Sequence, residues 1–169
     1  MILTRGKIII VAIFIAIVAG LAGLIAFTNV ETTQLEEQID VKLENVKMKV
    51  LDQQKNVMTI RVDFAVFNKS ERTLTISKID YELFANDKSL GNGFMSLETV
   101  PMVGRPSLFS NTSTTIPSDF QLKYSDDVSD IWNSLAASEE NSSISWRVKG
   151  MAEIESAFSI IPVLFESSL

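Results

Sequence analysis

Residues 58–66 read MTIRVDFAV, a stretch in which apolar side chains alternate with polar or small ones. All residues of one parity are large and apolar, whereas those between them are Thr, Arg, Asp and Ala. Side chains of a β-strand point to opposite faces in turn, so this pattern predicts a strand with one buried face. It is the clearest secondary-structure signal in the chain, and it indicates a mainly β fold.

Strand patterns flank this stretch on both sides. Residues 41–50 are apolar at nearly every second position, with a change of phase near residues 44–45. Downstream, the apolar residues of 74–76 share one parity and those of 79–83 share the other. A one-residue slip in register would expose the second set, so we predict a β-bulge near residues 77–78.

Turn residues divide the middle of the chain. Asn-Asp-Lys at 86–88 predicts a turn, after which residues 90–97 return as the partner strand of a hairpin. Residues 101–111 contain Gly and Pro and are expected to form a loop. Residues 114–124 resume a strand pattern, in which Pro117 indicates an edge strand or an irregular start because proline donates no backbone hydrogen bond.

The apolar period changes to that of a helix after residue 124. Ser125 is a suitable N-cap, and two Asp residues follow it where the helix dipole favours negative charge. The expected buried stripe of this short helix, which should end near Ser138, consists of Val128, Ile131, Trp132 and Leu135. Residues 144–154 then alternate again, and residues 158–165 are almost wholly apolar, which predicts a last strand buried on both faces.

The predicted order of elements is therefore five strands, one helix and two strands. Many short strands separated by turns, without regular alternation of strand and helix, predict an antiparallel β-sandwich. About 140 residues remain once the apolar N-terminal segment is set aside, enough for one domain with its own core.

The N-terminal segment has a different character. Residues 8–27 read IIIVAIFIAIVAGLAGLIAF and contain no charged or strongly polar side chain. A helix of this length spans about 30 Å, the thickness of a hydrocarbon core, so we predict a transmembrane helix from Ile8 to Phe27. Arg5 and Lys7 precede the span and acidic residues follow it. The positive-inside rule then places the N-terminus in the cytoplasm and the domain outside the cell membrane.

A cleaved secretory signal is the alternative to a permanent anchor. The apolar run exceeds the usual length of about 7–15 residues, and the only tolerable cleavage pattern, at residues 26–28, is a weak match. We therefore predict an uncleaved signal anchor that contacts the lipid bilayer in a single pass. The predicted parts of the chain are a cytoplasmic N-terminus (1–7), the membrane helix (8–27), a polar stalk (28–40) in which a short helix would fit, and the sandwich domain (41–169).

One face of the predicted membrane helix carries small residues. They include Ala12, Ala16, Gly20 and Gly23. Small residues let two membrane helices approach closely, so this is a candidate helix-packing face. Alanine and glycine are also simply frequent in membrane helices, and we favour this second interpretation.

The charge distribution restricts the partners of the chain. The net charge is −6, and residues 31–169 carry 13 basic and 21 acidic side chains, a net charge of −8. Nucleic acids and anionic lipid surfaces require a basic patch, so we expect no nucleic acid partner. Other membrane or envelope proteins stay candidate partners.

Side chains needed for much catalytic chemistry are missing from the sequence. It has no Cys and no His, which excludes disulfides and removes the commonest general base and transition-metal ligand. No Gly-rich phosphate loop and no nucleophile motif occurs. We therefore predict a protein that is not an enzyme, with no catalytic residues, no metal site and no cofactor.

Two groups of residues admit both a functional and a structural interpretation. Asp126, Asp127 and Asp130 could ligate a hard cation, but Asp at a helix start interacts favourably with the helix dipole, and we favour this role. Trp132 and Trp146 are in phase with the apolar residues of their elements. We expect both in the core rather than on a ligand-binding surface.

Three N-glycosylation motifs fall in predicted loops. They begin at Asn68, Asn111 and Asn141. Glycans could attach at these positions if the domain lies outside the membrane. In a chain rich in Ser, Thr and Asn such motifs also arise by chance, and the sequence leaves both interpretations open.

Five segments carry a resemblance to a known family. They are residues 62–68 (VDFAVFN), 74–76 (LTI), 79–84 (IDYELF), 89–93 (SLGNG) and 146–150 (WRVKG). Together they resemble the late embryogenesis abundant (LEA) group 2 family, also called the water-stress and hypersensitive-response (WHy) domain. The resemblance covers about residues 41–166. One departure is Lys69, because the family's strand usually ends in Asn-Pro and this chain has Lys69 in place of the Pro.

The resemblance implies a seven-stranded antiparallel fibronectin-III-like β-sandwich with one short helix, folded rather than disordered. It also implies a link to desiccation or stress protection, and it implies no catalytic residues. Two functions follow from the sequence. The first is a stress-protective or protein-binding module held outside the cell membrane. The second is an accessory subunit that docks beside a membrane enzyme or transporter.

Overall fold

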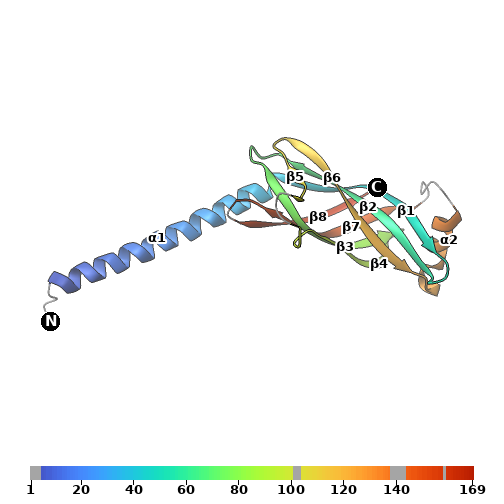
Figure 1. Ribbon diagram of the computed structural model, residues 1–169, viewed down its shortest axis with the longest axis horizontal. Coiled ribbons are helices and arrows are strands. Elements are labelled where there is room, and N and C mark those ends of the chain that lie inside the picture. Colours follow the sequence, from blue (N-terminus) through green and yellow to red (C-terminus); the bar gives the residue numbers. More distant parts are fainter. Residues whose placement is uncertain (1–4, 101–103, 138–143, 158) are drawn as a thin grey trace.

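The computed structural model describes residues 5–100, 104–137, 144–157 and 159–169. A long helix, α1 (Arg5–Glu36), projects from one end of an elongated β-sandwich, and a short helix, α2 (Ser129–Ala137), lies at the opposite end (Figure 1). The predicted class, a mainly β protein with antiparallel sheets and few helices, is confirmed.

Eight strands occur in the described part of the chain, one more than predicted. They are β1 (Ile39–Asp52), β2 (Val57–Asn68), β3 (Leu74–Ala85), β4 (Lys88–Ser96), β5 (Ser107–Leu108), β6 (Thr112–Lys123), β7 (Trp146–Glu155) and β8 (Ile160–Ser168). The additional strand is β5, a two-residue segment of the predicted loop that pairs with the start of β3. The other seven correspond to the predicted strands.

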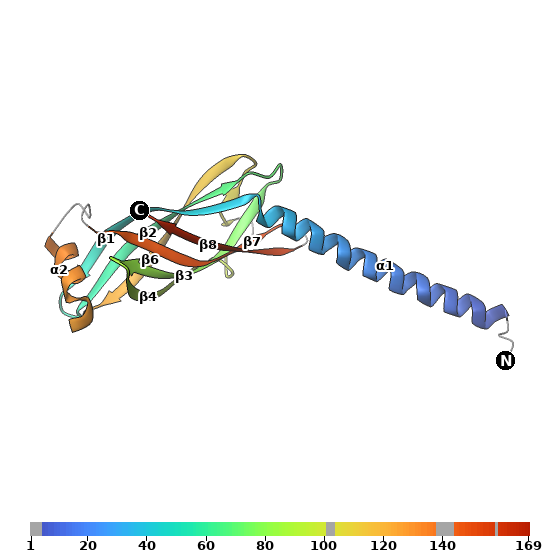
Figure 2. The same cartoon turned by 180° about the vertical axis from the view of Figure 1, so that it is seen from behind.

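Two antiparallel sheets face each other. One has the strand order β1-β2-β6 and the other has the order β4-β3-β7-β8, with β5 beside β3. Figure 2 shows the same two layers from behind, with α1 leaving the end at which β1 begins. β6 is an edge strand, as Pro117 indicated, although Pro117 lies within the strand and pairs with Asp63 rather than marking its start.

The two predicted irregularities of register are present. The pairing register of β1 with β2 shifts between Leu43 and Asn45, and that of β3 with β7 shifts between Ile76 and Lys78. Each shift lets the apolar residues on both sides of it point into the core, as the change of parity in the sequence requires. A second shift in β1, just before Val50, was not predicted.

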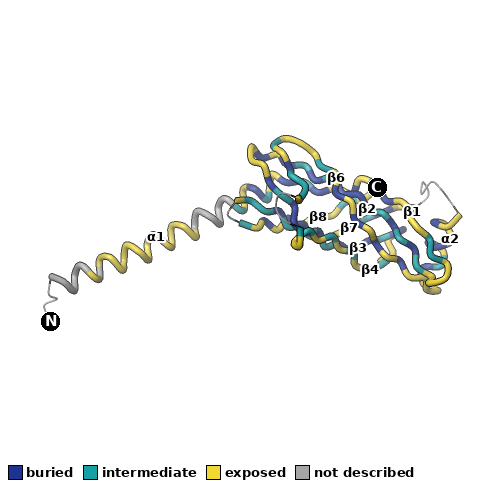
Figure 3. Tube along the Cα trace, viewed as in Figure 1, coloured by how far each residue is buried: buried dark blue, intermediate teal, exposed yellow. Residues whose placement is uncertain are grey.

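The core lies between the two sheets, and Figure 3 shows buried positions along both layers. Phe64, from the stretch that predicted the fold, is 0% exposed. Its ring meets those of Tyr81 and Phe165 from the other sheet edge-on, at centroid distances of 4.9 and 5.8 Å. Aromatic pairs in this geometry stabilise the contact beyond their buried area, so they help to hold the two layers together.

α2 closes the end of the sandwich that lies away from α1. Its predicted stripe is buried and consists of Val128, Ile131, Trp132 and Leu135. Trp132 packs edge-on against Tyr124 at a centroid distance of 5.5 Å, and Trp146 is also buried, so both tryptophans belong to the core as predicted. Ser125 has the extended backbone of an N-cap, but its side chain caps no amide, and a 3₁₀ turn (Asp126–Val128) precedes α2.

The prediction for the last strand is wrong in one respect. β8 alternates between buried and exposed residues, so only one of its faces lies in the core. Ile160 and Leu164 are 58% and 75% exposed. β8 is an edge strand, and in the described part of the chain nothing covers its outer face at Leu164. An apolar side chain in this strand is therefore not always a buried one. Phe158, predicted to begin this strand, lies outside the described residues.

In the segment 28–40, which was predicted to form a polar stalk with room for a short helix, α1 continues to Glu36 and β1 starts at Ile39. Leu35 and Ile39 are 5% and 6% exposed and belong to the core. Lys69 donates its backbone N–H to the carbonyl oxygen of Gln38 at 2.8 Å. The LEA group 2 family usually has proline at this position. Proline has no backbone N–H, so it could not make this bond between the helix end and the sandwich.

The predicted membrane span, residues 8–27, lies within α1. Among the residues that the structure describes, no helix combines the length and the apolar character needed to cross a membrane. The transmembrane assignment and the orientation of the chain stay predictions.

Candidate functional site

The predicted acidic cluster lies where the chain enters α2. Asp126, Asp127 and Asp130 are exposed, and each lies in the first turn of its helical segment. Within the ranges that the structure describes, no three His, Cys, Asp or Glu side chains come together in a way that could hold a metal ion. The position of these carboxylates is the one that the helix dipole favours.

Asn68, the first candidate glycosylation site, is a structural residue. It is 0% exposed, and its amide nitrogen donates to the carbonyl oxygens of Arg72 and Leu108 at 2.7 and 2.8 Å. Its Oδ1 accepts hydrogen bonds from the backbone N–H and the hydroxyl group of Ser70, at 3.0 and 2.6 Å. These bonds close the turn between β2 and β3. Because the amide nitrogen is buried and engaged, a glycan on Asn68 is incompatible with this folded arrangement.

The other candidate positions lie in different surroundings. Asn111 is exposed in the turn before β6 with a φ of 56°, a conformation that asparagine tolerates, and its amide nitrogen donates to Ser110 Oγ at 3.0 Å. Asn141 lies outside the described residues. The small-residue face of α1 is exposed, and it consists of Ala12, Ala16, Gly20 and Gly23.

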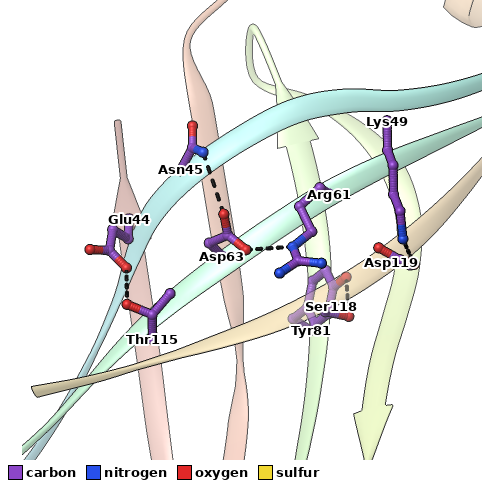
Figure 4. Close-up of polar contacts among 9 residues, drawn as sticks. All are labelled: Glu44, Asn45, Lys49, Arg61, Asp63, Tyr81, Thr115, Ser118 and Asp119. Carbon is purple, nitrogen blue, oxygen red and sulfur yellow. Dashed lines mark hydrogen bonds and ion pairs between the residues drawn. The ribbon is translucent and has the colours of Figure 1, made fainter.

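The outer face of the β1-β2-β6 sheet is polar and internally paired (Figure 4). Asp63 is 9% exposed and accepts hydrogen bonds from Arg61 Nε at 2.7 Å and from Asn45 Nδ2 at 3.4 Å. Asn45 lies at the register shift in β1, which aims its amide across the sheet. Lys49 pairs with Asp119 at 2.7 Å. This face therefore satisfies many of its polar groups without a partner.

Tyr81 links the two sheets through its hydroxyl group, which lies 2.9 Å from Ser118 Oγ on β6 (Figure 4). Burial raises the pKa of Tyr81 to about 12. Its neighbours in the sheet are Gly93 on one side and Gly150 on the other. A Cβ added at Gly93 would overlap the Tyr81 ring, and one at Gly150 would meet the backbone of Asp80. The Tyr and Gly residues of the family-like segments therefore form a packing arrangement.

The outer face of the β4-β3-β7-β8 sheet has a shallow depression of about 620 Å³, lined by residues of all four strands. One row across this sheet places Phe94, Asp80, Met151 and Leu164 side by side in register. Phe94 and Leu164, at the ends of the row, are 69% and 75% exposed. Exposed large apolar groups gathered around a few polar ones are typical of binding surfaces. This face is the candidate functional site.

Charged side chains occupy the neighbouring rows of the same face. Glu82 is paired in register with Lys149, and Lys78 with Glu153. Lys78 also contacts Asp80 at 2.6 Å, and this hydrogen bond raises the pKa of Lys78. The candidate face thus combines apolar ends with a centre of mixed charge.

The edges of the sheets are poorly suited to adding another strand. β6 and β8 are edge strands with proline inside them, at Pro117 and Pro162. β1 has two register shifts, and β4 has Gly91 at a φ of 112° beside a further shift. Proline and irregular backbone prevent continuous pairing along an edge. A sheet face is therefore the better candidate for recognition.

The sequence did not single out Phe94 or Leu164. Phe94 shares its parity with Asn92 and Ser96, two polar residues of the same strand, so a signal for an outward position was present. Leu164 was concealed in a run that is apolar at successive positions, where an exposed leucine and a buried one look alike.

The sequence matches no protein-family model and no curated protein. Solved structures with a similar fold include a protein from Archaeoglobus fulgidus, with 18% identity and a TM-score of 0.46 over 75% of this chain and 94% of that chain. A protein from Arabidopsis thaliana has 14% identity and a TM-score of 0.45 over 76% and 79% of the two chains. A protein provisionally described as late embryogenesis abundant has 15% identity and a TM-score of 0.41 over 91% and 87%. These similarities concern the fold alone, and no function is carried over from them.

Proposed function

We propose that the chain is a single-pass membrane protein that holds a non-catalytic, protein-binding β-sandwich outside the cell membrane. The observation that carries the proposal is the outer face of the β4-β3-β7-β8 sheet, where Phe94 and Leu164 are exposed beside charged side chains. Exposed apolar groups of this size gain free energy when a partner covers them.

The N-terminal segment supports the membrane anchor. Residues 8–27 contain no charge over a length that can span a hydrocarbon core, and they lie inside α1. Ile10 and residues 12–25 are exposed on this helix, where large apolar side chains favour lipid over water. Arg5 and Lys7 before the segment and acidic residues after it support a cytoplasmic N-terminus.

The junction between α1 and the sandwich supports a fixed spacing from the membrane. Residues 28–36 continue the helix for about 13 Å beyond the predicted span. Leu35 and Ile39 then anchor the end of the helix in the core. The domain would therefore stand on a short rigid support, with its candidate face clear of the lipid.

The family-like segments support the type of module. The strand order β1-β2-β6 opposite β4-β3-β7-β8 is compatible with the fibronectin-III-like sandwich that the LEA group 2 resemblance implies. We extend to this chain the link to stress protection that the resemblance implies, and we propose that the anchored domain shields surface proteins or the envelope during desiccation.

A second candidate function is an accessory subunit of a membrane enzyme or transporter. A further depression of about 480 Å³ lies beside α1, and its lining includes Thr33, Glu36 and Val163. Leu164 lines both this depression and the one on the outer face. A recognition surface that continues from the sandwich towards the helix favours a partner standing in the same membrane.

The anchor and its orientation are tested on the full-length chain. It should stay in the membrane fraction after washing with alkaline carbonate, and protease added to intact cells should remove the sandwich. Recovery in the soluble fraction contradicts the anchor. Protection of the sandwich in intact cells, with digestion only in inverted vesicles, reverses the orientation.

The binding face is tested by affinity purification in mild detergent with quantitative mass spectrometry. Replacing Phe94 and Leu164 by Ser should reduce partner recovery. Val50→Ser is a matched control, since Val50 is 53% exposed on the other sheet. Loss of partners only in the Val50→Ser variant would move the binding site to β1.

A further inference from the structure

We infer that the protein bound by the outer face of the β4-β3-β7-β8 sheet is a second copy of this chain, which meets it with the same face. The inference rests on the proposed anchor, which puts both copies in one membrane with their helices at the same end. The strands run along the length of the sandwich, and α1 leaves one end of it (Figure 1). A twofold axis that keeps both helices in one membrane must therefore run along the strands.

This axis determines which strands meet. A half-turn about a line in front of the sheet, parallel to the strands, keeps each residue at its height and reverses the order of the strands. β4 of one copy then faces β8 of the other, and β3 faces β7. Each cross-strand row of one copy therefore faces the same row of the second copy, with its residues in the opposite order.

One row has opposite charges at the positions that face each other across the two copies. It consists of Asn92, Glu82, Lys149 and Glu166. Glu82 of one copy faces Lys149 of the second copy, and Lys149 faces Glu82 in return. Both contacts lie beside the axis, at the centre of the interface. Opposite charges that meet across two packed sheets attract each other and fix the register of the pair.

The rows farther along the strands repeat this complementarity. Lys78 and Glu153 occupy β3 and β7 of one row, so each faces the opposite charge in the second copy. Phe94 and Leu164 occupy β4 and β8 of another, so each faces the other. In the described part of the sandwich these are the two most exposed large apolar side chains, and the pairing covers both of them.

The remaining contacts are tolerable. Asp80 faces Met151, but Asp80 already pairs with Lys78 of its own chain at 2.6 Å, and methionine adapts to irregular surroundings. Phe84 faces Arg147, and these two residues already form a cation–π contact within one chain, at 4.1 Å.

The other outer face fails the same test. In the β1-β2-β6 sheet the central strand would face itself, because a half-turn exchanges only β1 and β6. Arg61 lies on β2, between Lys47 and Asp119 in register. It would meet Arg61 of the second copy, and like charges facing each other are unfavourable. Two copies can therefore pair through the candidate face with opposite charges in contact at its central strands, but not through the other outer face.

The size of the face predicts a weak pair that depends on the membrane. Four strands about 4.8 Å apart and four rows about 7 Å apart give roughly 400–500 Å² on each copy. Stable complexes in solution bury about 1,200–2,000 Å² in total. Confinement to one membrane raises the effective concentration of the second copy and compensates for the small area.

Cysteine cross-linking in membranes tests the geometry, because the chain contains no Cys and each introduced thiol is unique. Full-length Phe94→Cys and Leu164→Cys chains with different tags are co-expressed. A short bismaleimide should join these two chains to each other. Lys47→Cys, exposed on the other sheet, is the matched control and should join neither. Equal yields with Lys47→Cys, or no product from the membrane-bound pair, overturn the inference.

A charge exchange separates contacts between copies from contacts within one chain. Glu82→Lys alone and Lys149→Glu alone each place like charges at both central contacts, and we expect about tenfold less co-isolated second copy. Co-expressed, the two variants restore both opposite-charge contacts in the mixed pair, although neither chain has its own pairing restored. Recovery of the mixed pair supports the inference, and a mixed pair no better than the single variants overturns it.

A separate measurement shows whether the proposed membrane anchor, rather than the pairing of the two faces, is wrong. If the full-length chain is recovered in the soluble fraction, the anchoring proposal fails. The Phe94→Cys and Leu164→Cys chains mixed at high concentration then still decide whether these faces pair. An unchanged thermal unfolding midpoint for each variant shows that a lost cross-link reflects lost pairing rather than unfolding.

Discussion

The outer faces of the two sheets have similar alternating backbones but differ in what they leave for a partner. On the β1-β2-β6 sheet, Asp63 lies between Arg61 and Asn45 and is nearly buried by them. On the β4-β3-β7-β8 sheet, Phe94 and Leu164 remain largely exposed. A face that pairs its own polar groups gains little from a partner, whereas one with exposed apolar groups gains free energy when they are covered.

The largest effect is expected at the end of the core that α2 covers. Trp132 closes the end of the core beneath α2, so Trp132→Ala leaves a cavity and should lower the free energy of unfolding by about 3–5 kcal/mol. Denaturant unfolding measures this change. Leu164→Ala removes an exposed side chain and serves as the control. An unfolding midpoint equal to that of the parent protein would place Trp132 on a partner surface instead.

The next effect concerns the link between the two sheets. Tyr81 has a folded pKa of about 12 against an ordinary value of 10.0, so the unfolded chain loses this proton first. Stability should be present in full below about pH 10 and fall as the pH rises towards 12, by about 2–3 kcal/mol. Urea unfolding across this range measures the fall. Tyr81→Phe should abolish it, and Tyr124→Phe, the other tyrosine, should not. An undiminished fall in Tyr81→Phe would assign it to another group.

A smaller effect is expected on the polar face. Asp63→Ala leaves Arg61 and Asn45 without their shared acceptor, at a cost of about 1–2 kcal/mol in the free energy of unfolding. Asp119→Ala is the matched control, because its partner Lys49 is well exposed and the loss should be about 0.5 kcal/mol or less. Equal losses would show that the pairs on this face contribute alike and that the burial of Asp63 adds nothing.

The smallest effect is expected on the candidate face. Phe94→Ser and Leu164→Ser remove side chains that make few contacts within the chain, so the free energy of unfolding should change by about 0.5 kcal/mol or less. Thermal or denaturant unfolding of full-length protein checks this. A loss as large as that of Asp63→Ala would mean that these side chains serve the fold, and would remove the main support for a binding face.

Much of the fold could be predicted because its signals are local. The alternation of residues 58–66 and the stripe from Val128 to Leu135 each report which side of one element faces the core. The bulge near residues 77–78 was visible because the apolar parity changes there, and a strand cannot bury both sets without an irregularity. The span over residues 8–27 is a sequence prediction of the same local kind.

The candidate site could not be predicted because it combines separate elements. Phe94, Asp80, Met151 and Leu164 come from four strands, and only the register of three strand pairs puts them in one row. The burial of Asn68 likewise depends on Leu108, forty residues later, so the glycosylation motif alone indicated a site that the fold does not leave open.

The sequence by itself determined the class of the domain, the inward side of nearly every strand and the stripe of α2, because periodicity records how one element meets the core. The tertiary structure decided which strands are neighbours, how far α1 extends into the domain and which outer face stays uncovered. These outcomes depend on contacts between residues far apart in the chain. In β8 the two kinds of information diverge, because its apolar residues predict burial on both sides and the absence of a described neighbour over Leu164 leaves one side exposed.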